Sequence, residues 1–545
     1  MTNILTNDIL YIENTEGEYH MENKKIKIYG VVLGVILFIL LISGLTYAIL
    51  SWRSSNITIT GTSECLEVES VKGSNITGSD LLLLDESQVV NSNQITIRTG
   101  MVVTNITAKL KSSCTLDGYL TINLKTTTLN SGFTSSGNST GALKYVLASY
   151  NPSTYTTIST SALNGKTFDI LTTGSITSTG TLKIKDAQLS KDTTLAYLVI
   201  FYIDGDKANN DIGSNSTNFK TSIEATVTQG KLPFATQITN LYNDAIKTPV
   251  TNNSITYQYD TTNSLMKDIG NNIRYYGASP NNYVYFNCST YPTTNCELWR
   301  IIGTFGDKIK IVRNESIGKY SWDNKDKTTG AETNYGKNDW TDARLMKLLN
   351  PGYDNESVGG SLYYNAKSGT CYVNQNNATT ACNFTSTGIK NDTTKNIIAE
   401  VTYNTAGYND ATLYPNEIYT YERGSTVYSG RQAKWTGKIG LMYPSDYGYA
   451  SDLTKCREKI NNYNASTCSQ NNWIHNMGSL WLLTHDSASS NRSWSINSSG
   501  NASVNGNGKG STSNGLLVFP SLFLSSNVKI ISGNGSINNP YQLGV

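Results

Sequence analysis

The pattern of hydrophobic positions is dominated by one segment near the N-terminus. Residues 28–52 contain no Asp, Glu, Lys or Arg over 25 positions. A helix needs about 20 apolar residues to cross the hydrocarbon core of a bilayer. Lys24, Lys25 and Lys27 come directly before the segment, and positive charge beside a span favours the cytoplasmic side. The pattern predicts a single-pass (type II) transmembrane helix over residues 28–52 in the cell membrane, a cytoplasmic tail over residues 1–27 and an extracellular C-terminus.

A cleaved signal peptide is the alternative interpretation of this segment. Its apolar region typically has about 7–15 residues and ends at an A-x-A-like site, for which Thr46-Tyr47-Ala48 is the nearest match. The length of the segment favours a retained anchor. Gly30 and Gly34 have the GxxxG spacing that can seat a helix dimer and so indicates self-association. Small residues are common in membrane spans, so a plain span is the favoured interpretation.

Residues 53–230 show the alternation of short β-strands. Strand-like runs separated by turn residues occupy 95–98, 101–107, 119–124, 181–184 and 195–203. The last run is continuously apolar, as expected for a central strand. Ile223, Ala225 and Val227 alternate with polar residues, as in a half-buried strand. Many short strands with turns between them predict a β-sandwich over residues 53–230.

A helical linker is predicted over residues 231–254, between the sandwich and a second outer domain. Pro249 is expected to end its helix. Residues with the spacing i, i+3, i+4, i+7 and i+8 form one apolar face of this helix, and they are Ile238, Leu241, Tyr242, Ala245 and Ile246.

Residues 255–545 combine strands with few helices and predict a disulfide-stapled α+β surface domain. A helix is expected after Asp339, which can cap it, with Ala343, Met346 and Leu349 on one face. A second, weaker helix is expected at about 394–403. The predicted strands are 298–304, 309–313, 439–443, 480–484 and 518–524. The whole chain is therefore predicted to be mainly β, with an N-terminal transmembrane helix, a β-sandwich and an α+β C-terminal domain.

Composition narrows the class of protein. The net charge is +2 and charged residues make up 15% of the chain, below the roughly 25% of typical soluble proteins. Basic residues do not cluster after Arg53, which argues against nucleic acid as a partner. Thr and Tyr suit strands, whereas Asn, Gly and Ser suit turns, and all five are abundant. This composition is typical of a β-rich surface protein.

The eight cysteines all follow the predicted membrane segment. An even number of cysteines in an exported chain indicates disulfides, and zinc would favour CxxC-like spacing with nearby His, which is absent. Closing loops this short adds about 2–3 kcal/mol each in the chain-entropy model. The connectivity stays open, but neighbours in sequence suggest the pairs Cys65 and Cys114, Cys288 and Cys296, Cys371 and Cys382, and Cys456 and Cys468.

One loop is rich in oxygen ligands. Asp204, Asp206 and Asp211 lie close together, and calcium takes six to eight oxygens that alternate acidic residues can supply. The terminal Glu of a twelve-residue calcium loop is missing. An ordinary turn rich in Asp and Asn is therefore favoured over a calcium site, and no cofactor is expected.

The sequence lacks a set of residues that would define an enzyme. No GxSxG, P-loop or dinucleotide-binding motif occurs. Of the three His, His20 is in the predicted tail, whereas His475 and His485 lie near Cys456 and Cys468 in sequence. A Cys–His pair needs a free thiol, and these thiols are expected in a disulfide, so structural His residues are favoured. The many Trp and Tyr of residues 255–545 are expected in the core, with an aromatic platform for sugars or peptides as the alternative.

The first outer domain resembles the camelysin/TasA-like sandwich proteins of Gram-positive bacteria. The resemblance covers about 170 residues and includes 197–204 (YLVIFYID) and 219–223 (FKTSI). It implies an exported, jelly-roll-like sandwich that in some members forms fibres. Camelysin has been described as a metalloprotease, but no HExxH occurs in this chain, so the resemblance does not carry that activity here.

The second outer domain resembles an uncharacterised domain of surface proteins from gut Firmicutes, which is similar to the C-type-lectin/formylglycine-enzyme-like fold. The family usually has Arg before the Pro of its last core strand, whereas Phe519 precedes Pro520 here, so a buried polar role for that Arg is absent. The matching segments are 298–303 (LWRIIG), 311–318 (IVRNESIG), 320–323 (YSWD), 338–340 (NDW), 345–353 (LMKLLNPGY), 440–450 (GLMYPSDYGYA), 532–536 (SGNGS) and 539–543 (NPYQL).

These observations lead to one expected function and two alternatives. We expect a membrane-anchored bacterial cell-surface protein with a non-catalytic ligand-binding or adhesive outer domain. Its expected partners are the lipid bilayer and a glycan or protein ligand. The first alternative is a structural subunit of a surface or biofilm fibre built through the sandwich, and the second is an uncharacterised surface enzyme.

Overall fold

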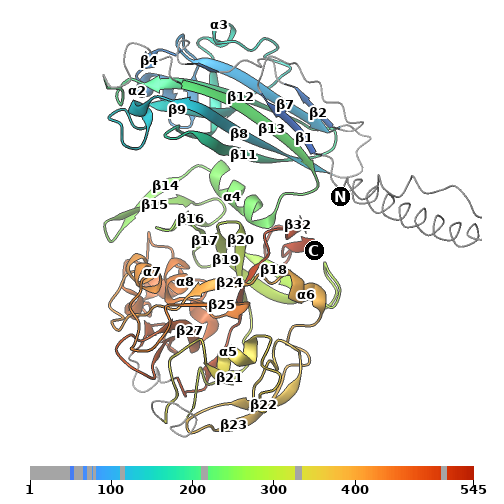
Figure 1. The fold of residues 1–545 in the computed structure, drawn as a ribbon, viewed down its shortest axis with the longest axis vertical. Coiled ribbons are helices and arrows are strands. Elements are labelled where there is room, and N and C mark those ends of the chain that lie inside the picture. The colour runs from blue at the N-terminus through green and yellow to red at the C-terminus, as the bar shows by residue number, and fades with distance from the viewer. Residues whose placement is uncertain are drawn as a thin grey trace, which may run out of the picture.

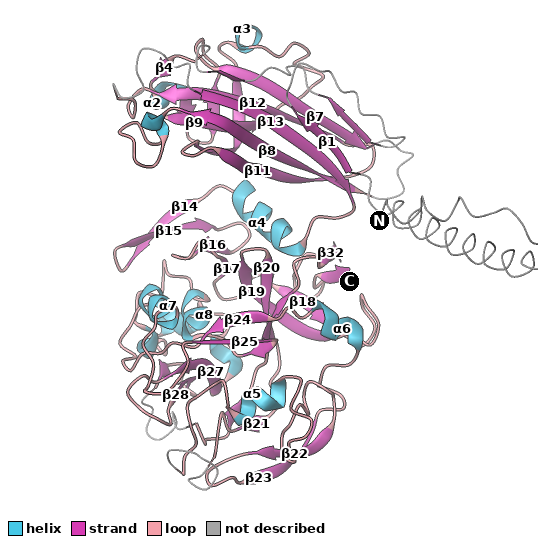
Figure 2. Ribbon diagram, in the orientation of Figure 1, coloured by secondary structure: helices cyan, strands magenta, loops and turns pink. Residues whose placement is uncertain are grey.

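The computed structural model describes residues 49–53, 66–69, 76–77, 81–110, 117–209, 219–325, 334–504 and 512–544. It is mainly β, with 39% strand and 13% helix. Figures 1 and 2 show a body of long strands above a more irregular body, with helix α4 (Phe234–Asp244) between them. We call the first body the sandwich (described residues from 49 to 230) and the second the C-terminal part (described residues from 231 to 544).

The sandwich consists of a five-stranded sheet and an eight-stranded sheet, as the sequence predicts. Its pairings are antiparallel except that of β4 with β12. The first sheet has the order β1 (Ile49–Arg53), β13 (Phe219–Gln229), β8 (Gly118–Leu129) and β11 (Gly180–Leu189), and β3 (Ile76–Thr77) pairs with β13. The second has the order β2 (Leu66–Glu69), β7 (Val102–Leu110), β12 (Thr194–Asp204), β9 (Leu143–Ser149), β10 (Thr167–Ser175), β6 (Gln94–Thr96) and β5 (Val90–Asn91), and β4 (Leu83–Leu84) pairs with β12.

Alternating apolar residues give the two sheets a shared core. Leu120 and Leu124 of β8 are fully buried together with Val199 of β12. The intervening residues of β12, such as Leu198 and Ile200, belong to a second buried cluster on the opposite face of the same sheet. An outer layer that includes β6 and the short helices α2 (Glu86–Val89) and α3 (Thr160–Leu163) contributes to this second cluster. Because β12 is covered on both faces, its sequence is a continuous apolar run.

The end of the predicted membrane helix is a strand in the structure. Strand β1 pairs with β13 in a register that places Leu50 opposite Val227 and Trp52 opposite Ala225. The prediction is wrong for residues 49–52, because a short apolar run does not distinguish helix from strand and β13 offers it backbone hydrogen bonds. Residues 28–48, including Gly30 and Gly34, lie outside the described residues. No helix in the described ranges is long and apolar enough to cross a membrane.

Helix α4 forms in the predicted segment and buries Ile238 and Tyr242 of the predicted apolar face, but not the whole of that face. Phe234, Ile238 and Tyr242 pack into the core of the C-terminal part, whereas Leu241 is 39% exposed and Ile246 78% exposed. The helix ends at Asp244, before the predicted Ala245 and Ile246 can join its face. Pro249 does not end it, because Pro249 belongs to β14 (Thr248–Asn252), an edge strand where a missing N–H is tolerated.

The C-terminal part is organised around a nine-stranded sheet. Its central strands β19 (Glu297–Phe305) and β20 (Lys308–Arg313) confirm the two strands predicted at 298–304 and 309–313. The order is β14, β15 (Ile255–Asp260), β16 (Leu265–Lys267), β17 (Ile273–Tyr275), β19, β20, β31 (Ser521–Leu524) and β26 (Ile439–Gly440), and β18 (Tyr283–Phe286) pairs with β19.

A five-stranded sheet and three two-stranded sheets complete the described strands of the C-terminal part. The five-stranded sheet has the order β21 (Lys319–Tyr320), β30 (Leu516–Leu517), β27 (Leu480–His485), β28 (Ser493–Ile496) and β29 (Ala502–Ser503). The two-stranded sheets are β22 (Ser368–Tyr372) with β23 (Thr379–Asn383), β24 (Val401–Asn404) with β25 (Lys434–Gly437), and β32 (Lys529–Ser532) with β33 (Gln542–Gly544).

The helices of the C-terminal part are short. Helix α5 (Arg344–Leu349) is present, but Asp339 does not cap it: its carboxylate accepts hydrogen bonds from Thr341 in a local turn, and Ala343 holds the cap position. Helix α6 (Asp392–Ile397) is capped by Asn391 and ends well before the predicted residue 403, because Tyr403 lies in β24. The other described helices of the C-terminal part are α7 (Pro415–Glu422), α8 (Pro444–Tyr449) and α9 (Ser466–Ser469), with 3-10 turns at Ile460–Asn462 and His475–Met477. A 3-10 turn at Ser131–Phe133 belongs to the sandwich.

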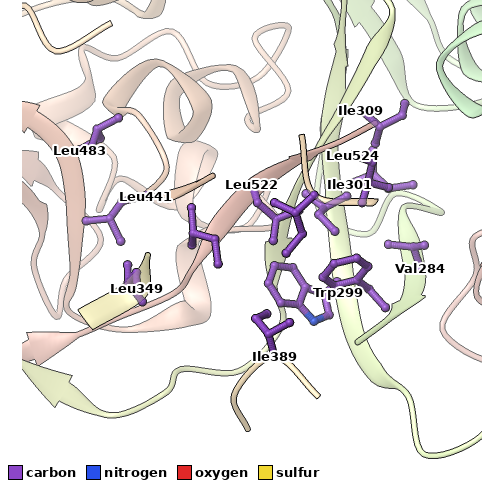
Figure 3. Packing of buried hydrophobic residues seen from close by; sticks show 14 of the residues in the cluster. Val284, Trp299, Ile301, Ile309, Leu349, Ile389, Leu441, Leu483, Leu522 and Leu524 are labelled. Atoms are coloured by element: carbon purple, nitrogen blue, oxygen red, sulfur yellow. The ribbon is translucent and has the colours of Figure 1, made fainter. Parts of the chain in front are cut away.

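Strand, helix and loop residues meet in the main core of the C-terminal part (Figure 3). Trp299 of β19 is fully buried, and its indole Nε1 donates to Glu297 at 3.1 Å. Leu522 of β31, Leu349 of α5 and Leu441 near β26 pack in the same cluster. Complete burial of such side chains stabilises the fold by about 1.5–3 kcal/mol each. Residues of α4 belong to the same core, so this packing holds the helix on the C-terminal part.

Candidate functional site

The two bodies meet through polar contacts around α4. The amide of Asn240 on this helix donates to the backbone oxygen of Asp186 on β11 at 2.6 Å. Lys185 on the same strand forms an ion pair with Asp244 at the end of α4, also at 2.6 Å. Just before the helix, the backbone N–H of Leu232 donates to the side chain of Gln188 at 3.1 Å. One face of α4 is therefore buried in the C-terminal part, and the other is bound to the edge strand β11.

Hollows lie on either side of this helix. The larger has a volume of about 920 Å³ and is bordered by β11, β12, α4 and the β32–β33 hairpin, and we call it the cleft. A smaller hollow of about 330 Å³ also has Lys185, Asp186 and Asp244 in its lining. Ligand sites favour the junction between domains, and their volumes are commonly about 300–1,000 Å³. By size and position, the cleft fits a binding site.

The lining of the cleft is mostly uncharged and polar. Its charged residues are paired, since Lys185 contacts Asp244 and Lys183 contacts Asp186 at 2.7 Å. Tyr197 and Tyr541 contribute to its floor and are largely buried, at 6% and 7% exposure. Burial, with a smaller effect from Asp244, raises the pKa of Tyr197 and keeps its hydroxyl protonated. The walls carry side-chain amides, each with a donor and an acceptor, from Gln188, Gln237, Asn240, Asn263, Asn281 and Asn534.

The three local cysteine pairs are disulfides, as predicted. Cys288 is bonded to Cys296, Cys371 to Cys382, and Cys456 to Cys468. They close loops with sequence separations of 8, 11 and 12 residues. Cys65 and Cys114 lie outside the described residues, so their pairing stays a prediction.

In the acidic loop considered as a calcium site, the carboxylate of Asp204 already has partners within the protein. Asp204 is 1% exposed, and its carboxylate lies 3.9 Å from Lys144 and 3.4 Å from Lys207. Asp204 also accepts a hydrogen bond from the backbone of Asp206, which forms a local turn. The neighbouring carboxylate of Asp85 raises the pKa of Asp206. Asp211 lies outside the described residues. Within the described ranges, no three His, Cys, Asp or Glu residues are grouped so as to hold a metal ion.

The two histidines of the C-terminal part are in separate structural environments. His485 is buried, and its Nε2 accepts a hydrogen bond from the backbone of Tyr428 at 3.4 Å. Burial, followed by Arg431, lowers the pKa of His485 to about 4, which keeps the ring neutral. His475 contacts the hydroxyl of Tyr447 at 3.2 Å. Cys456 and Cys468 are bonded to each other, so they supply no thiol to either ring.

The tryptophans of the C-terminal part lie in its interior. Trp299, Trp322, Trp481 and Trp494 are at most 1% exposed, and Trp340 is 2% exposed. Trp435 is partly buried and packs against Trp340 with the ring centres 6.0 Å apart. This placement favours the core interpretation of these residues, and an exposed platform of tryptophans is not among the described surfaces.

The sequence analysis missed a buried ionic cluster in the C-terminal part. Arg274 and Lys310 both contact the carboxylate of Asp446, each at 2.5 Å, and Arg274 also contacts Asp268 at 2.7 Å. All four side chains are at most 1% exposed. Burial by itself raises the pKa of Asp446, but Lys310 and Arg274 together outweigh it and lower the pKa to about 2. The only sequence sign is that Lys310 interrupts an apolar strand.

Comparison of the sequence with protein-family models and with curated proteins gives no match. The two resemblances, to camelysin/TasA-like sandwiches and to the C-type-lectin/formylglycine-enzyme-like fold, therefore stay predictions. Fold and site together define a two-part, mainly β protein with local disulfides and a polar cleft at the junction of its parts.

Proposed function

We propose that this protein is a non-catalytic, membrane-anchored binding protein of the bacterial cell surface, and that its cleft beside α4 holds an uncharged segment of a glycan or protein ligand. The observation that carries the proposal is the cleft itself. It has about 920 Å³, lies at the junction of the two parts, and is lined by six side-chain amides. Its lining brings no nucleophile together with a base in the described residues, so binding is the role it supports.

The chemistry of the lining supports an uncharged ligand. Lys185 and Asp244 neutralise each other at 2.6 Å, so neither is left to attract an ion. Gln188, Gln237 and Asn240 already donate an N–H within the chain, and the second N–H of an amide can still donate to a hydroxyl or peptide group. Leu195 and Leu241 add apolar surface beside them. A ligand with alternating polar and apolar groups meets both kinds of surface.

The location is proposed from the apolar segment and its flanking charges. With β1 starting at Ile49, the segment available for the membrane is 28–48, which has 21 residues. This is still about the 20 residues that a helix needs to cross a bilayer. The sandwich then lies next to the membrane, and the C-terminal part lies farther out.

The alternative of a fibre subunit is supported by one observation. Strand β1 lies at the edge of the five-stranded sheet, and β2 lies at an edge of the other. Edge strands offer unpaired backbone groups to a neighbouring molecule. Filaments seen by electron microscopy for the purified protein favour this alternative, and a monodisperse monomer at the same concentration excludes it.

The binding function is tested with full-length protein in nanodiscs on a glycan array and on immobilised mucin. Asn281 lines the cleft and is exposed, so Asn281→Trp places a large side chain in the opening. Asn409→Trp is the matched control, because Asn409 is exposed and lies outside the cleft lining. We expect binding to fall about tenfold or more with Asn281→Trp and to stay unchanged with Asn409→Trp. Absence of wild-type binding to both surfaces, or equal effects of the two variants, contradicts the proposal.

A further inference from the structure

The sandwich has a hollow of its own, which lies away from the cleft lining. Its volume is about 550 Å³, and it shares no lining residue with the cleft. The end of β9, the loop that follows it and the start of β10 form most of its wall, and Gln94 of β6 completes it. We call it the sandwich groove. The lining residues used below are Gln94, Tyr150, Asn151, Tyr155, Thr167 and Asp169.

The two tyrosines of the sandwich groove are held in place from beneath. The hydroxyl of Tyr150 accepts a hydrogen bond at 2.8 Å from the amide of Asn105, which is 3% exposed. The ring of Tyr155 packs edge-on against Phe168 with the ring centres 5.1 Å apart, and Phe168 is 5% exposed. Both tyrosines are half-buried, so part of each ring stays on the groove side. Aromatic groups fixed before binding lose little conformational entropy when a ligand arrives.

Exposed polar side chains border the tyrosines. The amide of Gln94 donates to the carboxylate of Asp169 at 2.8 Å, which orients both groups. The side-chain oxygen of Asn151 accepts a hydrogen bond from the backbone N–H of Ser153 at 2.9 Å. The hydroxyl of Thr167 lies 3.1 Å from that of Thr96. Amide, hydroxyl and carboxylate groups therefore surround two anchored aromatic rings.

We propose that the sandwich groove binds a neutral carbohydrate. A sugar ring has an apolar C–H face that packs on a tyrosine ring, and hydroxyl groups that donate to a carboxylate and exchange hydrogen bonds with amides. Asp169 is the charged residue of the lining, and the groove has no Lys or Arg in the ranges described, so an anionic sugar meets repulsion and no counter-charge. The volume is in the usual range of a small-molecule site. This site goes beyond the proposed function, which assigns binding to the cleft.

Saturation-transfer NMR on the full-length protein in nanodiscs tests this proposal. The probes are cellotetraose, maltotetraose and the N-acetylglucosamine tetramer, and a heparin tetrasaccharide is the anionic comparison. We expect at least one neutral probe to bind with a dissociation constant below about 10 mM. Tyr155→Ala is expected to weaken the binding of that probe about tenfold. Tyr285→Ala is the matched control, because Tyr285 is a half-buried tyrosine of β18 outside the groove, and it keeps wild-type affinity.

Two further variants keep the proposal falsifiable if Tyr155→Ala fails to fold. Asp169 is exposed, so Asp169→Lys leaves the fold intact. This variant is expected to weaken the binding of the neutral probe several-fold and to let the heparin fragment bind. Asn281→Trp blocks the cleft, so binding of the neutral probe that persists in Asn281→Trp and is lost in Asp169→Lys belongs to the sandwich groove. No binding of any neutral probe at about 10 mM, tighter binding of the heparin fragment to the wild type, or unchanged affinity in Asp169→Lys overturns the proposal.

Discussion

At the scale of single residues, the strongest constraint on the C-terminal part is charge placed in its interior. Asp446 is enclosed by Arg274, Lys310 and the backbone N–H of Tyr443. Removing one partner of such a group leaves an uncompensated charge away from water, whereas the intact set is close to neutral in its effect on stability. The cluster therefore acts mainly on the specificity of folding. Strands β17 and β20 and helix α8 pack together only when Arg274, Lys310 and Asp446 are paired with one another.

Replacement of Asp446 by Asn tests this condition. The variant removes the carboxylate that contacts both Arg274 and Lys310. Arg274 keeps Asp268, but Lys310 loses its contact with Asp446, and we expect the free energy of unfolding to fall by about 3–5 kcal/mol. Asp307→Asn is the control, since Asp307 is exposed and pairs with its neighbour Lys308, and it should change stability by less than about 1 kcal/mol. Denaturant unfolding of both variants makes the comparison, and a loss of similar size in both argues against the cluster.

The same carboxylate predicts how stability depends on pH. Its pKa is lowered from 3.8 to about 2 in the folded protein, after Lys310 and Arg274 outweigh the effect of burial. The folded state then binds fewer protons than the unfolded state between those values, so this contribution is present above about pH 4 and is lost as the pH falls toward 2. Unfolding midpoints measured from pH 5 to pH 2 should fall more steeply in the wild type than in Asp446→Asn.

The sequence could not have predicted this cluster. Arg274 and Asp446 are 172 positions apart, and Lys310 is 136 positions from Asp446. Nothing in their local patterns links them, because the contact is made by tertiary packing. The three disulfides are different, since each pair is so close in sequence that neighbour pairing is the simplest choice.

At the scale of elements, patterns that extend over a whole strand were predictive and patterns at element ends were not. The run at 195–203 gave a strand in the centre of the sandwich, because burial on both faces requires continuous apolar residues. Asp339 failed as a helix cap, because its carboxylate binds Thr341 in a turn that the sequence permits equally. The cleft depends on how α4 meets β11, which no local pattern contains.

Strand β1 can be tested by cross-linking. Ser51 lies opposite Thr226 in the antiparallel pairing, so Ser51→Cys with Thr226→Cys should form a disulfide on mild oxidation. Ser51→Cys with Thr228→Cys is the control, because these residues are two positions out of register. Mass spectrometry of a digest detects the cross-linked peptide. Failure of the first pair, or equal yields from both pairs, contradicts the strand.

The disulfide loops should each contribute to stability by a similar amount. Double replacement of Cys456 and Cys468 by Ala opens a loop with a separation of 12 residues. We expect a loss of about 2–3 kcal/mol in the free energy of unfolding, because the unfolded chain regains the entropy that the bond removes. The wild type treated with iodoacetamide without reductant should gain no mass at the six cysteines of the three disulfides. Labelling of these cysteines would show that the bonds are not formed.

At the scale of the whole molecule, the junction between the two parts is the feature on which the proposed function depends. The sandwich and the C-terminal part each have their own core, and they meet through Asn240, Lys185 and Asp244 around α4 rather than through a large apolar surface. Polar junctions of this kind permit small relative movements of two bodies. The proposed function places the ligand between the sandwich and the C-terminal part.

Hydrogen–deuterium exchange of the full-length protein, with and without a glycan or mucin fragment that it binds, tests the central claim most directly. The account predicts that the bound ligand slows exchange in peptides covering residues 185–188, 237–245 and 530–534, which border the cleft, and that Asn281→Trp abolishes this protection. Protection confined to other surfaces of the C-terminal part, with the cleft peptides unchanged, would contradict it.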